Sequence, residues 1–198
     1  MILAGSVVAS LGIGWLRRGS LRGLARVPLR WGALAVLAFA IQALFIYQAT
    51  PHQVVAGTWG WSEVLFLGSH ALLLAVAWTN RRLDGMVWIG LGLLLNLAVM
   101  MANRGWMPIS PQALVQAGHA HLAPSLEPGT RVLSSKNIVL SYAETRLWFL
   151  SDVFVLASPF PIPSVFSIGD ALVAWGVLIL IQGAMLSADA SIPFRPVT

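Results

Sequence analysis

The sequence predicts an all-α fold: a polytopic membrane helix bundle of about five transmembrane helices, plus a long extracytoplasmic loop with short helical or interfacial segments. Three observations predict this class. The 198-residue chain is 58% hydrophobic and only 10% charged, whereas a typical soluble domain is about 25% charged. Its apolar residues gather in five runs that approach the length of a membrane span. Its basic residues gather in alternate connections between these runs.

The five apolar runs define the predicted spans of a single integral membrane domain, residues 1–198. They cover residues 2–16, 31–49, 61–78, 86–102 and 165–186, and they leave residues 103–164 as the outer loop. The first run is short, but no Lys or Arg precedes it and five Arg follow it. Because a signal peptide has the opposite charge order, we expect this run to be a span.

The basic residues predict the orientation of the spans. Eight of them lie in the first connection, the third connection and the tail: Arg17, Arg18, Arg22, Arg26, Arg30, Arg81, Arg82 and Arg195. Only four lie on the other side, diluted over the long loop: Arg104, Arg131, Lys136 and Arg146. Since cytoplasmic connections carry the excess of Lys and Arg, we expect an inner (cytoplasmic) membrane protein with its N-terminus outside and its C-terminus in the cytoplasm.

The first connection, residues 17–30, has two interpretations. Arg18, Arg22 and Arg26 recur every four residues beside an apolar edge, which is typical of a short helix among anionic lipid headgroups. The alternative is a charged loop that only sets topology, since Pro28 limits any helix. We expect the lipid bilayer as a partner in both cases, and no nucleic acid, because no nucleic-acid-binding module is recognisable.

Tryptophans are expected at both membrane interfaces, where the ring meets lipid and the N–H meets water. The predicted cytoplasmic ends hold Trp15, Trp31 and Trp78, and the predicted outer ends hold Trp59, Trp61 and Trp106. Trp88 and Trp175 lie deeper in their runs. We expect these two to pack between helices.

Small residues recur at helical spacing in the first and last runs. They are Gly5, Ala9 and Gly12 in the first, and Gly169, Gly176 and Gly183 in the last. Such stripes let helix backbones approach closely in lipid, where no hydrophobic drive brings helices together. Both stripes therefore predict helix-packing faces.

Polar residues inside or beside the apolar runs are the candidate site, because a polar group in hydrocarbon is costly. The candidate polar pocket consists of Glu63, His70, Asn103, Arg104, Asp152 and Asp170. One interpretation is an outer-leaflet pocket, covered by the loop, that binds a cation or carries a proton. The other is that these groups cap helices and fasten the loop. In either case we expect protein donors at Asp170: Arg104, the loop backbone or its own first turn, with Ser167 as the N-cap.

The outer loop contains its own structural signals. Ser110 and Pro111 predict the start of a short helix that runs to Gln116. The apolar run 147–155 is too short to span a membrane, so we expect it to lie at the outer interface or to re-enter partly. His119 and His121 stand two apart, but with no carboxylate or cysteine close in sequence they do not predict a metal site.

Known catalytic motifs are not found in the sequence. It contains no GxSxG elbow, HExxH helix, Walker loop or dinucleotide fingerprint. It also contains no cysteine, which excludes thiolate catalysis, thiolate metal sites and disulfides. The sequence therefore names no catalytic residue, no metal site and no cofactor.

Three short stretches carry a resemblance to a known family. The matching positions are Asn103, Gly105, Met107 and Pro108, then Thr145, Leu147, Leu150, Asp152 and Val153, and finally Ser167, Gly169 and Asp170. With these residues the chain resembles a family of small, uncharacterised, multi-pass bacterial membrane proteins defined by a domain of unknown function. The resemblance implies the five-span plan and directs attention to Asp152 and Asp170. It implies no reaction.

Three functional hypotheses follow from these observations. The leading one is a non-enzymatic accessory or scaffold subunit in a membrane assembly, with a membrane-protein partner or further copies of itself. The second is a small transporter or ion- or proton-handling protein that uses the polar pocket. The third is an enzyme that acts on lipid-linked substrates at the outer interface.

Overall fold

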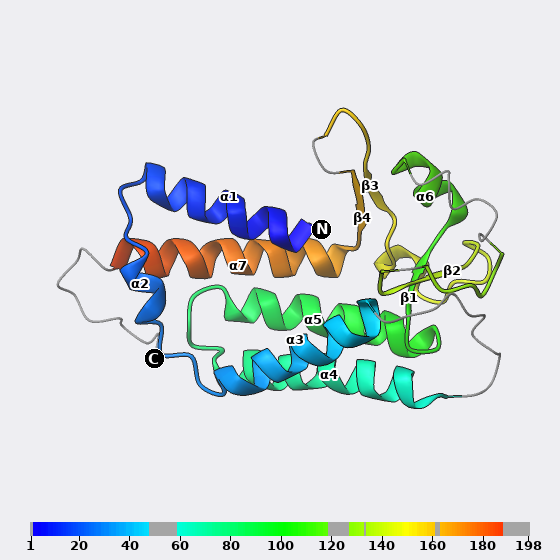
Figure 1. Ribbon diagram of the computed structural model, residues 1–198, viewed down its shortest axis with the longest axis horizontal. Helices are drawn as coiled ribbons and strands as arrows, with labels where there is room; N and C mark the ends of the chain where they lie inside the picture. The colour runs from blue at the N-terminus through cyan, green and yellow to red at the C-terminus, as the bar shows by residue number, and fades with distance from the viewer. Residues whose placement is uncertain (1, 48–58, 119–126, 133, 161–162, 188–198) are drawn as a thin grey trace.

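The computed structural model describes residues 2–47, 59–118, 127–132, 134–160 and 163–187. Five long helices and a smaller head of short elements make up this part of the chain (Figure 1). The long helices are α1 (Ile2–Leu16), α3 (Gly32–Tyr47), α4 (Trp61–Thr79), α5 (Met86–Ala102) and α7 (Ile168–Ser187). The short helices are α2 (Arg22–Ala25), α6 (Pro111–Gln116) and the 3-10 turn η2 (Trp148–Leu150). The strands are β1 (Met107–Ile109), β2 (Asn137–Val139), β3 (Phe154–Leu156) and β4 (Ser164–Phe166).

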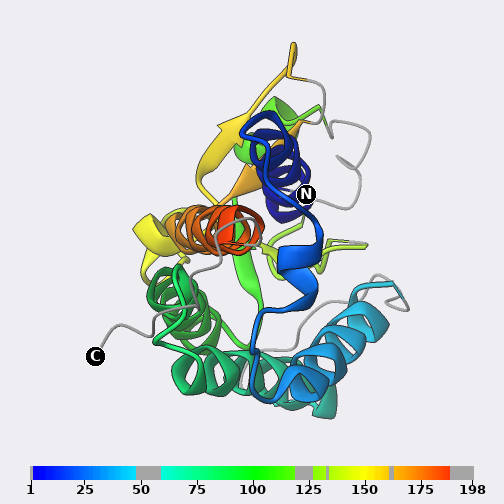
Figure 2. The same ribbon diagram turned by 90° about the vertical axis from the view of Figure 1, so that its left-hand side faces the viewer.

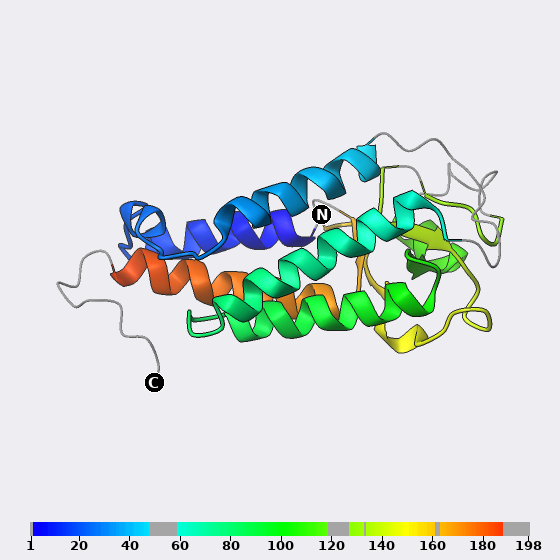
Figure 3. The same cartoon turned by 90° about the horizontal axis from the view of Figure 1, so that it is seen from below.

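The long helices form an elongated bundle with the head at one end (Figure 1). Helix α7 packs against both α5 and α1, and α4 packs against both α3 and α5. The view along the bundle shows the helices as an open arc rather than a closed ring (Figure 2). Seen from below, α4 lies beside α5 (Figure 3).

The predicted helical class is confirmed, but the helix lengths support fewer spans than expected. Among the described residues, only α4 and α7, with 19 and 20 residues, form helices that are both long and apolar enough to cross a membrane. The helices α1, α3 and α5 are apolar but have 15, 16 and 17 residues, so a five-span bundle does not follow from length. Fewer than half of the residues in the apolar windows of α4 and α7 are buried.

Glycines explain how α5 and α7 come close. A Cβ at Gly176 would lie 2.6 Å from the Gly85 carbonyl oxygen, and a Cβ at Gly92 would lie 2.4 Å from the Gly169 carbonyl oxygen. The packing stripe predicted on α7 is therefore confirmed at Gly169 and Gly176. At Gly5 and Gly12, the stripe predicted on α1 packs against no other described part of the chain, because the position of a Cβ is open at both. The glycine of α1 that packs against α7 is Gly14, which lies against Met185.

The head contains the strands that the all-α prediction missed. Strands β1 and β2 pair in parallel, with Met107 opposite Asn137, and β3 and β4 pair antiparallel, with Phe154 opposite Phe166. Each strand has only three residues, which is too short for an alternating pattern to be recognised in the sequence. The predicted helix from Pro111 to Gln116 is confirmed as α6, and its Ala113 N–H donates to the Ser110 hydroxyl over 3.1 Å.

One hydrophobic core joins the head to the bundle. It contains Phe66 of α4, Val99 and Met100 of α5, Met107 of β1, Ile138 of β2, and Trp106. The run 147–155 does not form a re-entrant helix: it becomes η2, which lies against α5, and then enters β3. None of the three residues of η2 is buried. The hydrophobic core described above holds strands β1 and β2 against the ends of α4 and α5.

Three tryptophans lie elsewhere than predicted. Trp106 is fully buried, not at an interface, because its N–H finds a carboxylate inside the protein. Trp88 and Trp175 are exposed, at 42% and 54%, and do not pack between helices. The other interface tryptophans of the prediction, Trp15, Trp31, Trp59, Trp61 and Trp78, are all exposed.

Candidate functional site

A lysine in the head lies between two carboxylates, one from the head and one from the bundle. The Lys136 Nζ is 2.6 Å from Asp170 Oδ2 and 3.7 Å from Asp152 Oδ1. The two aspartates are buried, and the side chain of Lys136 is 23% exposed. We name Lys136, Asp152, Asp170, Asn96 and Asn137 the lysine clamp, because their contacts join the head to the bundle.

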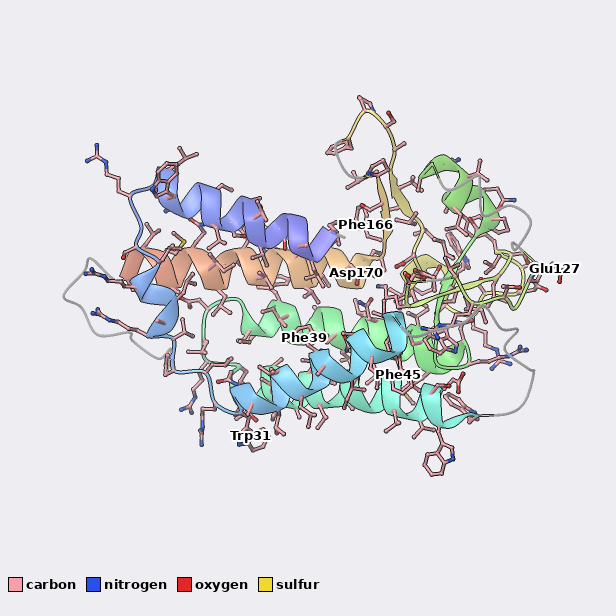
Figure 4. All side chains as sticks on the ribbon, viewed as in Figure 1. Trp31, Phe39, Phe45, Glu127, Phe166 and Asp170 are labelled. Atoms are coloured by element: carbon pink, nitrogen blue, oxygen red, sulfur yellow. The ribbon has the colours of Figure 1, made fainter. Side chains whose placement is uncertain are left out.

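Helix α7 supplies Asp170 from its first turn, at the head end of the bundle (Figure 4). The Ser167 hydroxyl accepts the Asp170 N–H over 3.0 Å and donates to Asn96 Oδ1 over 2.9 Å. Ser167 is therefore the N-cap that the sequence predicted. A carboxylate at this position is also stabilised by the positive end of the helix dipole.

Helix α5 supplies Asn96, whose amide donates to Asp170 Oδ1 over 2.7 Å. The close approach needs a glycine on α7, since a Cβ at Gly169 would lie 2.1 Å from Asn96 Oδ1. The two oxygens of the Asp170 carboxylate thus meet Asn96 and Lys136 respectively. Gly169, conspicuous in the sequence as a packing residue, is also what makes this hydrogen bond possible.

The head supplies Asp152, which follows η2 and lies beside β1. Its N–H donates to the Pro108 carbonyl over 3.1 Å, and its Oδ2 accepts the Asn137 amide over 2.7 Å. Its Oδ1 has no hydrogen bond among the described residues and faces only the more distant Lys136 ammonium. The backbone of β1 and the first residue of β2 therefore hold this carboxylate next to the lysine.

Burial and charge determine which groups of the lysine clamp are ionised. Burial raises the pKa of the Asp152 carboxyl to about 6, although the Lys136 ammonium and the Asn137 hydrogen bond act to lower it. Burial would lower the pKa of Lys136, but the Asp152 and Asp170 carboxylates raise it above its usual value. Lys136 is therefore a permanent cation near neutral pH. Asp152 is the carboxyl that takes up a proton under mildly acidic conditions.

Glu63 belongs to a second cluster, not to the lysine clamp. Its Oε1 accepts the Trp106 indole N–H over 3.1 Å, and its Oε2 accepts the Ser62 hydroxyl over 2.9 Å. The guanidinium of Arg131 lies 4.0 Å from the centre of the Trp106 ring, donates to the Phe45 carbonyl and is buried. A buried indole is thus held between a carboxylate at its edge and a cation at its face, the arrangement its charge distribution favours.

The remaining predicted residues have separate positions. His70 Nδ1 lies within hydrogen-bonding distance of Gln42 Nε2, at 3.3 Å, and of the Phe66 carbonyl oxygen, at 3.0 Å. Asn103 holds the backbone of Arg146, accepting its N–H over 2.9 Å and donating to its carbonyl over 2.8 Å. Arg104 is exposed at the end of α5, and the cation beside Asp170 is Lys136, not the Arg104 that the sequence suggested.

The predicted pocket is therefore divided. The structure brings Asp152 and Asp170 together and places Glu63, His70 and Asn103 in contacts of their own. Sequence reasoning missed Lys136, Arg131 and Asn137, and it left Asn96 out of the pocket. One signal for Lys136 was available: it is the single lysine of the chain. Within the described residues no group of three His, Asp or Glu side chains could hold a metal ion, and His119 and His121 lie outside that part of the chain.

The arrangement is chemically suited to two tasks. The first task is to fasten the head to the bundle. Asp170 of α7 accepts a hydrogen bond from Asn96 of α5 and forms an ion pair with Lys136 of the head, so these two contacts join three separate segments. The carboxyl of Asp152 can also exchange a proton, because one of its oxygens has no hydrogen-bond partner among the described residues.

Comparison with known proteins identifies the family. No curated protein and no solved structure gave a match. A family model, described as Family of unknown function (DUF5317), matches residues 26–182. This range includes the lysine clamp, the Glu63 cluster, the long helices α3, α4 and α5, and most of α7. The chain therefore belongs to the Family of unknown function (DUF5317).

Proposed function

We propose that the protein is a multi-pass membrane protein with α1, α3, α4, α5 and α7 as five spans. The supporting observation is the surface of these helices. They contain only two charged residues, Glu63 and Asp170, and both are buried in first turns at the head end. Valine, leucine and phenylalanine side chains point outward instead, including Val8, Val36 and Phe39. Such an apolar surface is suited to contact with lipid and not with water.

The three shorter helices fit this proposal if their ends lie in the interface. A helix of 15 to 17 residues is about 22–26 Å long, against a hydrocarbon core of about 30 Å. Trp15 closes α1, Trp31 precedes α3, and both are exposed. Interfacial tryptophans and flanking arginines that reach to the headgroups accommodate a short span, as does local thinning of the bilayer.

The proposed orientation places the head outside the cytoplasm. Seven exposed arginines lie at the end of the bundle opposite the head: Arg17, Arg18, Arg22, Arg26, Arg30, Arg81 and Arg82. Among the described residues at the head end, Arg104 and Arg146 are the exposed basic residues, while Arg131 is buried and Lys136 is partly buried. The difference in exposed charge supports the positive-inside assignment, with the N-terminus outside and the C-terminus in the cytoplasm.

We propose that the protein acts as an accessory or scaffold subunit of a membrane assembly, not as an enzyme. The observation that carries this proposal is the lysine clamp. The polar groups of Asn96, Asn137 and Asp170 bond to one another, to Lys136 or to neighbouring backbone, and so hold the head rigidly on the spans. A rigid head on a small bundle is suited to presenting a fixed surface to another membrane protein or to further copies of the chain.

The scaffold proposal is tested by purification from native membranes in mild detergent, without crosslinking, followed by mass determination of the particle. We expect a particle heavier than the 21.3 kDa chain, with a constant ratio of one partner or of further copies. The variant Asp152→Asn, which keeps the shape of the side chain, should give the same particle. A particle that contains a single chain and nothing else would contradict the proposal.

A second candidate function is proton handling, and Asp152 is the observation that favours it. This carboxyl is buried, has one oxygen without a hydrogen bond among the described residues, and has a pKa raised by burial to about 6. In proteoliposomes with a trapped pH-sensitive dye, proton movement by the wild type that Asp152→Asn abolishes would establish this function. Equal dye signals from wild-type and protein-free vesicles would exclude it.

A further inference from the structure

The end of the bundle opposite the head carries a concentrated positive surface. It consists of Arg17, Arg18, Arg22, Arg26, Arg30, Arg81 and Arg82, all exposed, and we name it the arginine surface. Two segments supply it: the connection from α1 to α3, which includes α2, and the turn from α4 to α5. Trp31, at the start of α3, lies at this end and Asp170 at the other (Figure 4). Figure 2 looks onto this end and shows α2 crossing it between α1 and α3.

The backbone that carries these arginines is fixed to the bundle at both of its ends. The Ser20 N–H donates to the Met185 carbonyl of α7 over 2.9 Å. At the other end the buried Asn80, which follows α4, accepts the Arg30 N–H and donates to the Arg30 carbonyl, each over 2.8 Å. The arginines therefore stand on an ordered support, and the entropy lost when a ligand binds is smaller than for a loose loop.

The charges of the arginine surface are not balanced by protein carboxylates. Within the described residues none of its seven arginines forms a salt bridge, and the acidic side chain at this end is Asp84. Two of the guanidinium groups touch neutral partners: Arg17 donates to Gln182 Oε1 over 3.1 Å, and Arg81 lies 4.9 Å from the centre of the Trp78 ring. Seven cations against one carboxylate, counted over the described part of the chain, leave a surface that attracts anions.

Apolar side chains surround the arginines. Trp15 and Trp78 are 77% and 68% exposed, and Leu21, beside α2, is 65% exposed. Tryptophan rings at this level and guanidinium groups just beyond them match the order of acyl chains and headgroups in one leaflet. A site for a free anion would need the cations but would not explain the exposed leucine and tryptophans. The combination indicates a lipid surface as the source of the anion.

We propose that the arginine surface binds the headgroup phosphates of anionic phospholipids, with Arg18, Arg22 and Arg26 as its principal contacts. The proposal rests on the proposed membrane function and goes beyond it, since topology alone requires no preference among lipids. The aromatic and leucine side chains lie among the acyl chains below the same headgroups. Each arginine near an anionic leaflet contributes about 1 kcal/mol, so three of them correspond to roughly a 100-fold difference in affinity.

The test compares the wild type with Arg18→Gln/Arg22→Gln/Arg26→Gln, both purified in a neutral detergent and titrated with phosphatidylglycerol or phosphatidylcholine. The readouts are bound lipid by native mass spectrometry and the thermal unfolding midpoint. We expect phosphatidylglycerol to bind the wild type in preference to phosphatidylcholine, and the triple variant to lose that preference with a drop in affinity of roughly 100-fold. The single variants Arg22→Gln and Arg146→Gln form a matched pair: the first should weaken binding and the second, at the head end, should not.

Three outcomes would overturn the proposal. The first is equal binding of the two lipids by the wild type, and the second is an unchanged preference in the triple variant. The third is equal stabilisation by inorganic phosphate at the same phosphate concentration, which would assign the surface to a free anion. Insertion into phosphatidylcholine vesicles is measured separately. Wild-type protein that inserts but shows no lipid preference contradicts this inference alone, whereas protein that does not insert at all contradicts the proposed membrane function as well.

Discussion

Replacing Lys136 with methionine is expected to lower the free energy of unfolding by about 3–5 kcal/mol, the usual cost of removing one partner of a buried ion pair. Methionine fills a similar volume but leaves the buried carboxylates of Asp152 and Asp170 without their cation. The measurement is unfolding in mixed micelles, followed by the fluorescence of the nine tryptophans. A loss of this size would show that the lysine clamp is a main connection between the head and the bundle.

Two further variants isolate the ionic part of this effect. Adding Asp152→Asn and Asp170→Asn to Lys136→Met removes the stranded charges and should recover a large part of the loss, because neutral amides can keep the contacts to Asn137 and Asn96. Arg146→Gln is the control: it neutralises an exposed basic residue of the head and should change stability by less than about 0.5 kcal/mol. If Lys136→Met unfolds like Arg146→Gln, the lysine does not hold the head in place.

Replacing Gly176 with alanine should destabilise the protein by about 2–3 kcal/mol, and with valine by more. The added Cβ would lie 2.6 Å from the Gly85 carbonyl oxygen and 2.8 Å from the Ile89 nitrogen. Both are backbone atoms of or next to α5, so the clash is relieved only by moving α5 and α7 apart, and overpacking of this kind typically costs 1–3 kcal/mol. The same unfolding measurement reports the loss.

Gly12→Ala in α1 is the matched control for this prediction. Nothing lies within 4 Å of a Cβ at Gly12, so alanine should be neutral or should stabilise the helix by up to about 1 kcal/mol through its higher helix propensity. The two substitutions are chemically identical, but only the one at Gly176 is expected to destabilise the protein. Equal effects at Gly12 and Gly176 would show that the α5–α7 contact is not the close packing described above.

Local features of the fold could be predicted from the sequence because their causes are local. The apolar run 86–102 gives the bounds of α5 directly, and the run 61–78 misses only Thr79 of α4. Ser110 with Pro111, and Ser167 with Asp170, predict helix starts because the capping atoms lie within three residues of each other. The last span was predicted to begin at residue 165, but 164–166 form β4 and the helix begins at Ile168.

The contacts of the lysine clamp could not be predicted, because they join residues far apart in the chain. Lys136 lies 34 residues before Asp170, and Asn96 lies 74 residues before it. No periodic pattern relates these positions, and the segment between α6 and β2 resembles a polar connection in the sequence. The same holds for Trp106, whose burial depends on a carboxylate 43 residues away in α4.

The central claim is that the bundle crosses the membrane with the lysine clamp on the outer side. Since the chain has no cysteine, a single introduced cysteine is the only thiol that a labelling reagent can modify in the protein. Ala143→Cys is placed in the head and Asp84→Cys in the turn between α4 and α5, both at exposed positions. In spheroplasts, a membrane-impermeant maleimide should label Ala143→Cys, and it should label Asp84→Cys only after the membrane is permeabilised. Labelling of both positions in intact spheroplasts, or of Asp84→Cys alone, would contradict the claim.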